Sequence, residues 1–236
     1  MSSIDAIINR QFHLWEQEKA GRQESTSPPV LPPRIVTISR QNGSRGAYLA
    51  GKLADRLGYQ LIHREIIDAI CQSSGYRKKM IEALDERHRS KLQMVVDSLV
   101  SGQAVDHGDY VRHLYQVILS MARLGGIVLI GRGGNFILGP RRGFHIRVVC
   151  PRDKRIANLI AYKNVPAAAA PAEVDHSDAE RREFIHKLFR ADIDAPRHYD
   201  IVVNTDYVDV EELTPGLVES IKGKLSKLAR MEREGH

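Results

Sequence analysis

The sequence predicts an α/β fold, a parallel β-sheet with helices on both faces. Five short apolar runs rich in Ile and Val alternate along the chain with segments of helical periodicity. Each run is apolar throughout, a pattern that indicates burial on both faces and therefore a parallel sheet. The expected strands are 35–39, 59–62, 127–131, 144–150 and 200–205.

The segments between these runs predict the helices. Residues 47–58 form a helix that ends at Gly58, and 64–124 are mostly helical with a break at 101–109. Further helices are expected at about 152–163 and 178–190, separated by a loop-like stretch with two prolines. For the C-terminal helix, Asp209 and Thr214 are both candidate caps. Thr214 is favoured because Pro215 would then occupy a first helical position.

The N-terminal region is predicted to be an appendage. Residues 1–20 form an amphipathic helix, in which Ser2 could cap and Ile4, Ile8, Phe12 and Trp15 share one face. A Pro-rich linker at 21–34 ends it, and the main domain spans 35–229. The apolar face must pack on the main domain, on a second subunit in a homodimer, or on another partner, and the sequence leaves the three open.

Composition excludes several classes of function. Cys71 and Cys150 are the only two cysteines among 236 residues, too few and too far apart for a structural zinc site, and both are expected to be reduced and buried. No membrane span or secretory signal is recognised, so a cytoplasmic protein without membrane partners is expected. The net charge of +6 indicates an anionic ligand. Arginines near predicted loops favour nucleotide phosphates over nucleic acid.

The turn after the first strand has the pattern of a phosphate-binding loop. A strand, a Gly-containing loop and a helix leave free N–H groups and a helix dipole directed at one point. Gly43 and Gly46 permit the tight turn, while Arg40 and Arg45 add charge. The expected binding loop comprises Arg40, Gly43, Ser44, Arg45, Gly46, Ala47 and Tyr48.

This loop departs from the usual G-x-x-x-x-G-K-[ST] pattern. Gly46 stands where Lys belongs and Tyr48 stands where the hydroxyl residue belongs. Arg45 is the nearest cation, although a planar guanidinium does not replace an ammonium without rearrangement.

Taken together, the blocks ISRQNGSRGAY, IGRGGNFIL and RADIDAPRHYDIVVNTD resemble the cytidylate kinase-like family. The resemblance covers about residues 35–222. It implies a P-loop NTPase-like five-stranded parallel sheet flanked by helices, with a helical NMP-binding region and a lid at about 152–192. It also implies phosphoryl transfer from ATP, with Mg²⁺, to a nucleoside monophosphate, CMP or dCMP.

The resemblance carries several arginines to expected roles. Arg132, Arg64 and Arg112 are implied to bind the monophosphate, Arg132 as a bidentate phosphate ligand. Two neighbours depart from the family pattern: His63 replaces an Asp, and Gly133 replaces the Asp that reads the base in cytidylate kinases proper.

In the lid, arginines are implied to neutralise the phosphoryl group in transfer. Arg45, Arg132 and Arg181 are expected to share that charge as the catalytic set. No residue is assigned to a metal. The lid cations are Arg155, Arg181, Arg182, Lys187 and Arg190.

Two other functions fit the sequence. One is a weak or inactive nucleotide-binding regulatory protein, which the unusual residues Gly46, Tyr48 and His63 suggest. The other is a kinase acting on a different small acceptor, because a fold does not specify its substrate.

Overall fold

A computed structural model describes residues 3–23, 34–84, 86–101 and 108–234. Five strands form one parallel sheet in the order β2-β3-β1-β4-β5. The predicted α/β fold with a five-stranded parallel sheet is confirmed. The strands are β1 (Ile35–Arg40), β2 (Gln60–Ile62), β3 (Ile127–Ile130), β4 (Phe144–Val149) and β5 (Ile201–Asn204).

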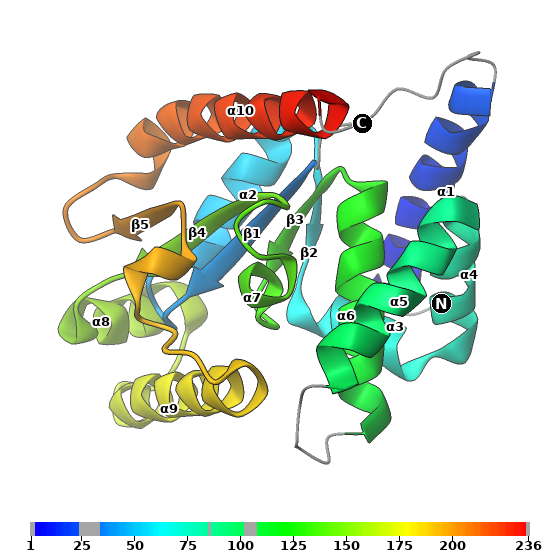
Figure 1. Ribbon diagram of the computed structural model, residues 1–236. Helices are drawn as coiled ribbons and strands as arrows, with labels where there is room; N and C mark the ends of the chain where they lie inside the picture. The colour runs from blue at the N-terminus through cyan, green and yellow to red at the C-terminus, as the bar shows by residue number, and fades with distance from the viewer. Residues whose placement is uncertain (1–2, 24–33, 85, 102–107, 235–236) are drawn as a thin grey trace.

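Ten helices and one 3₁₀ turn are present in the described ranges (Figure 1). Within these ranges no helix is both long and apolar enough to cross a bilayer. The bounds are α1 (Ser3–Gln23), α2 (Gly46–Leu57), α3 (Arg64–Gln72), α4 (Ser74–Ala83), α5 (Glu86–Ser101), α6 (Gly108–Leu124), α7 (Gly134–Leu138), α8 (Arg152–Lys163), α9 (Ala170–Phe189), η1 (Pro196–His198) and α10 (Val210–Glu234).

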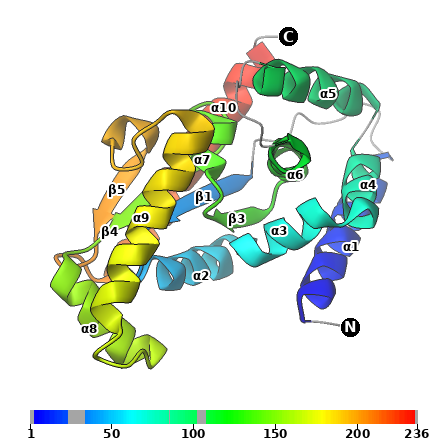
Figure 2. The ribbon, with the colours of Figure 1, turned by 90° about the horizontal axis from the view of Figure 1, so that it is seen from below.

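The sheet is buried on both faces. Successive residues of β3 alternate between two cores: Val128 and Ile130 pack with α2 and α10, whereas Ile127 and Leu129 pack with the helices of the opposite face. A third, small cluster joins α8 to α9 through Leu159 and Val174. Figure 2 shows these two helices at one side of the molecule and the α3–α6 region at the other.

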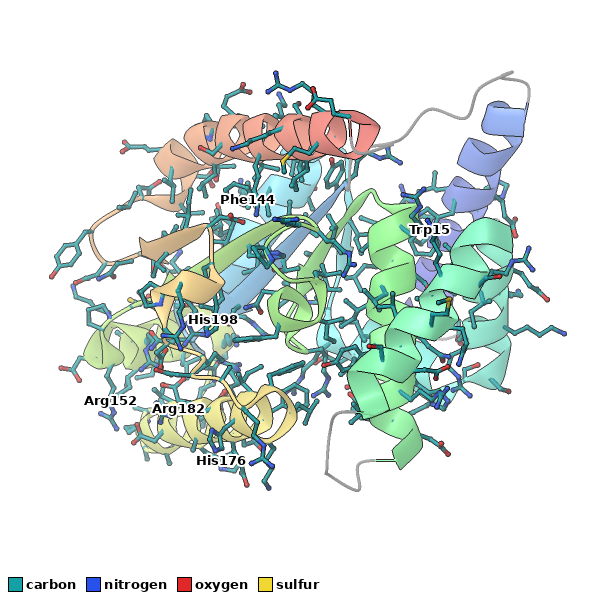
Figure 3. The ribbon with its side chains drawn as sticks, viewed as in Figure 1. Trp15, Phe144, Arg152, His176, Arg182 and His198 are labelled. Atoms are coloured by element: carbon teal, nitrogen blue, oxygen red, sulfur yellow. The ribbon has the colours of Figure 1, made fainter. Side chains whose placement is uncertain are left out.

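The N-terminal helix packs on the main domain, one of the three possibilities left open by the sequence. Ile8, Phe12 and Trp15 are buried in the core of the α3–α6 region. The indole Nε1 of Trp15 donates to the carbonyl of Gly125, 3.0 Å away, at the C-terminal end of α6. Figure 3 shows Trp15 on the side of α1 that faces these helices. The face predicted to be apolar is thus covered within the chain. Ser2, the predicted cap, lies outside the described residues.

Two sequence expectations about helix starts are wrong. First, α9 begins at Ala170 rather than near 178, because Pro171 lies in the first turn, where a missing N–H costs no helical hydrogen bond. Second, α10 starts at Val210, and Asp209 caps it by accepting from the N–H groups of Glu211 and Glu212. Thr214 instead donates to the carbonyl of Val210 within the helix.

The predicted linker and the predicted break in the α5–α6 region are only partly visible. α1 continues to Gln23, three residues past the expected boundary, and 24–33 lie outside the described residues. Of the expected break at 101–109, residues 102–107 also lie outside them. Cys71 and Cys150 are free and buried, as expected.

Candidate active site at the carboxyl ends of the strands

Two cavities meet where β1 and β3 end. The loop cavity, of about 440 Å³, is enclosed by residues 40–48 and by the last two turns of α8. The larger cavity, of about 590 Å³, lies between β3, α3 and α9. Arg40 and Arg181 line both cavities, so a ligand that spanned them would pass these two guanidinium groups.

The loop between β1 and α2 has the geometry of an anion-binding turn. Gly43 has a φ of 78°, and a Cβ atom there would lie 2.4 Å from the carbonyl oxygen of Arg155, so glycine is required. Helix α2 has no side-chain cap at its N-terminus. Among the described residues, the N–H groups of Gly46, Ala47 and Tyr48 have no backbone acceptor. These unpaired donors and the helix dipole favour an anion at this point.

Residues that follow the loop do not restore the missing motif. Neither Ala47, which directly follows Gly46, nor Tyr48 carries an aliphatic hydroxyl. The phenol of Tyr48 donates to Glu211 of α10, which also pairs with Lys52, 2.9 Å away. Tyr48 is thus held by α10.

Arg45 adopts a left-handed conformation, with φ 56°, at the start of α2. Its guanidinium lies 4.9 Å from the ring centroid of Tyr48 and 5.8 Å from that of Tyr162. Both contacts are within cation–π range. Arg45 therefore lines the loop cavity while stacked on two exposed tyrosines.

Arg40 and Arg181 form a partly buried pair of like charges. Arg181 Nη1 donates to the backbone carbonyl of Arg40 at 3.0 Å. Burial, and next the charges of Arg181 and Arg64, lower the pKa of Arg40 to about 10. Burial likewise lowers the pKa of Arg181, although nearby Asp178 opposes the shift. Burial and mutual repulsion both disfavour the charged forms of these two side chains. Their close approach therefore indicates a site that binds an anion.

In the larger cavity, Arg132 is held by a carboxylate. Its Nε donates to Asp68 Oδ1 at 2.8 Å, its Nη2 pairs with Oδ2, and Tyr110 donates to the same Oδ1 at 2.9 Å. Burial lowers the pKa of Arg132, but the hydrogen bond to Asp68 and the nearby charges of Tyr110, Asp68 and Cys71 together outweigh it, and the net shift is upward. Arg64 lines the same cavity and pairs with its neighbour Glu65 at 2.8 Å.

Gly133, in the same cavity, is held against helix α9. Its φ is 64°, and a Cβ atom would lie 2.3 Å from Cε2 of Phe189 and 2.7 Å from Cζ. The ring of Phe189 stacks on Phe136, with centroids 5.2 Å apart. The space that a base-reading Asp would need is thus filled by an aromatic ring of α9.

The other predicted cations are distributed unevenly. Lys187 lines the larger cavity and pairs with Glu183. Arg155 is buried and connects the loop to α9, since it donates to the carbonyl of Asn42 at 3.4 Å and to Asp178 at 2.8 Å.

Four predicted residues line neither of the two cavities: Arg155, described above, and Arg112, Arg182 and Arg190. Arg112 pairs with Asp97 of α5, and Arg190 is the exposed left-handed residue that ends α9. Arg182 is exposed on α9, labelled in Figure 3, and lines a small cavity beside Arg181.

Sequence reasoning overlooked three residues of the site. Asp68 lies one helical turn after Arg64, a spacing that puts both on one face of α3. Asn42 and Lys163 hydrogen-bond to each other across the loop cavity. No local signal identifies Lys163, because 121 residues separate it from its partner.

The described residues contain no group of three or more His, Cys, Asp or Glu that could hold a metal ion. A divalent cation at this site would therefore depend on ligand phosphates for most of its coordination, as Mg²⁺ often does.

Several known proteins are similar to parts of this chain. A curated uronate isomerase of Corynebacterium glutamicum is 32% identical over 108 residues, 45% of this chain, and the chain spans only about a fifth (21%) of that relative's length. An uncharacterized protein of Eubacterium ventriosum has a similar solved structure, with TM-score 0.63 and 18% identity over 81% of this chain and 99% of the other. A shikimate kinase of Bacteroides thetaiotaomicron gives TM-score 0.46 at 12% identity, over 80% and 98% of the two chains.

The likeness to the Eubacterium ventriosum structure bears on the fold alone. The sequence model of the cytidylate kinase-like family, in contrast, matches residues 35–207, which include every residue that lines the two cavities. The chain therefore belongs to the cytidylate kinase-like family.

Proposed function

We propose that this protein transfers the γ-phosphoryl group of ATP to a nucleoside monophosphate, with CMP and dCMP as the first candidates. The observation that carries the proposal is the position of Arg40 and Arg181, which line both cavities and lack a carboxylate partner within ion-pair distance in the described part of the chain. A donor in the loop cavity and an acceptor in the larger one would exchange a phosphoryl group beside them.

The residues present fit a triphosphate. The unpaired N–H groups of 46–48 and the glycine turn at Gly43 suit the inner phosphates, and Arg40 and Arg181 suit the outer ones. ATP would bring the phosphoryl group, and Mg²⁺ would supply positive charge at its phosphates.

The chemistry asks little else of the chain. An oxygen of the acceptor phosphate forms a bond to the γ-phosphorus while the bond to the β–γ bridging oxygen breaks, so a diphosphate and ADP result. Arg181 and Arg132 would stabilise the charge on the transferred group and position the acceptor. Asp68 holds Arg132 in place and would be a positioning residue.

The test is ADP release from MgATP, screened over all common ribo- and deoxyribonucleoside monophosphates. For the variants, Arg181→Ala is matched by Arg182→Ala, the adjacent exposed arginine, which lines neither of the two large cavities. We expect Arg181→Ala to lower kcat by about 100-fold or more, in the range of a lost preorganised donor, and Arg182→Ala to lower it less than about threefold. Equal decreases of kcat in the two variants would show that Arg181 has no specific role in phosphoryl transfer.

A second candidate is a nucleotide-binding regulatory protein without turnover. The stacking of Arg45 on Tyr48 and Tyr162 favours it, because the guanidinium is already engaged by these two rings. Nucleotide binding without ADP formation from any acceptor would support this alternative. If instead Arg45 acts in transfer, Arg45→Ala lowers kcat more than it weakens nucleotide binding.

A further inference from the structure

The loop of this chain cannot carry its own lysine. A Cβ atom at Gly46 would lie 2.6 Å from Cβ of Arg40 and 3.2 Å from Cβ of Val148. The position where a P-loop ordinarily has Lys is thus closed by the side chain of Arg40. A cation for the outer phosphates has to come from elsewhere in the fold.

Lys163, the last residue of α8, brings an ammonium to this cavity. It lines the loop cavity, and its Nζ donates to Oδ1 of Asn42, a buried loop residue, at 3.0 Å. The amide nitrogen of Asn42 donates in turn to Glu173 Oε1 at 3.1 Å. Asn42 thereby holds Lys163 beside the loop.

The ammonium of Lys163 is available to bind an anion. Its recorded partner is a neutral amide, and no ion pair of Lys163 with a carboxylate is found within the ranges that the structure covers. Burial and then the positive charge of Arg40 lower its pKa, whereas Glu173 opposes them. An anion that enters the cavity would relieve this repulsion.

We propose that Lys163 binds the outer phosphates of a triphosphate in the loop cavity, in place of the lysine that Gly46 excludes. The inference rests on the proposed function for its role in transfer, but not for phosphate binding itself. Because Lys163 ends α8, the cation belongs to the expected lid segment 152–192 rather than to the loop.

Binding is measured first, by calorimetry with inorganic triphosphate, ATP and AMP. Lys163→Met is compared with Lys154→Met, which changes a lysine of the same helix that is outside both cavities and faces Asp206 at 3.6 Å. We expect Lys163→Met to weaken triphosphate and ATP binding by tenfold or more and AMP binding by less than threefold. Lys154→Met should change none of them by more than twofold.

Chemical labelling of the wild-type protein distinguishes phosphate binding by Lys163 from a purely structural role of this residue. The lysines are acetylated in a short pulse with N-hydroxysuccinimidyl acetate and quantified by mass spectrometry, with and without inorganic triphosphate. We expect triphosphate to protect Lys163 at least fivefold and to leave Lys154 unchanged. Equal labelling of Lys163 in both conditions, or wild-type protein that binds no triphosphate, overturns the inference.

The two proposals fail in distinguishable ways. Triphosphate binding that depends on Lys163, with no ADP released from any acceptor, retains this inference and rejects the kinase function. If Lys163→Met turns over with unchanged kcat and unchanged ATP affinity, the kinase function is retained and this inference is rejected.

Discussion

A single added methyl group at Gly133 tests how tightly α9 packs against this position. In Gly133→Ala the new Cβ meets Cε2 and Cζ of Phe189 at 2.3 and 2.7 Å, distances at which something must shift. Phe189 cannot turn away freely, because its ring stacks on Phe136 at 18° and lies 6.3 Å from the ring of Tyr115. Overpacking of this kind costs about 1–3 kcal/mol.

Gly58 provides the matched control. It has almost the same backbone conformation, φ 67° and ψ 31° against φ 64° and ψ 27° at Gly133, but a Cβ atom there meets nothing within 4 Å. Gly58→Ala therefore measures the cost of a left-handed alanine alone, about 1 kcal/mol. The difference between the two variants isolates the contact with Phe189.

The assay is thermal and denaturant unfolding of both variants. Relative to Gly58→Ala, Gly133→Ala should be less stable by about 1–3 kcal/mol, or roughly 2–12 °C in Tm for a chain of this size. In a Phe189→Leu background, which lacks the contacting ring atoms, that difference should disappear. Equal costs at both glycines in the wild-type background would refute the contact, and with it the explanation of why no Asp stands at 133.

Three further outcomes are expected. Burial lowers the pKa of His145 from 6.5 to about 4, so the neutral imidazole contributes stability above pH 6.5 that is lost as pH falls toward 4. Urea unfolding across this pH range should show the wild-type protein losing about 3 kcal/mol of stability that His145→Gln does not lose. Identical pH profiles of the two proteins would contradict this. Trp15→Phe should cost about 1–3 kcal/mol in the same assay, since it removes the hydrogen bond to Gly125 and buried volume; a neutral result would mean that α1 is not anchored there. Arg132→Ala should weaken monophosphate binding by about 1.5–3 kcal/mol in calorimetry, and unchanged affinity would exclude Arg132 from the acceptor site.

Much of the fold is predictable from local patterns. Apolar runs such as 127–131 are recognisable because burial on both faces of a parallel sheet requires apolar residues at successive positions. Since ligands of such sheets bind at the carboxyl ends of the strands, the loop at 40–48 and Arg132 could also be placed near one site. Helix starts were less predictable: Pro171 lies in the first turn of α9 within a stretch that looks loop-like, and Pro215 lies inside α10, where proline ordinarily indicates an end.

Contacts between distant parts of the chain were decided only by the tertiary structure. The sequence by itself determined which segments are strands, their order along the chain, and the cations near their carboxyl ends. These features are local, because periodicity and turn residues act over a few positions. It could not determine that Arg132 is held by Asp68, 64 residues away, or that Phe189 fills the space beside Gly133. Nor could it place Lys163 at the loop, since the position of its ammonium depends on how α8 packs, a global property with no local signature.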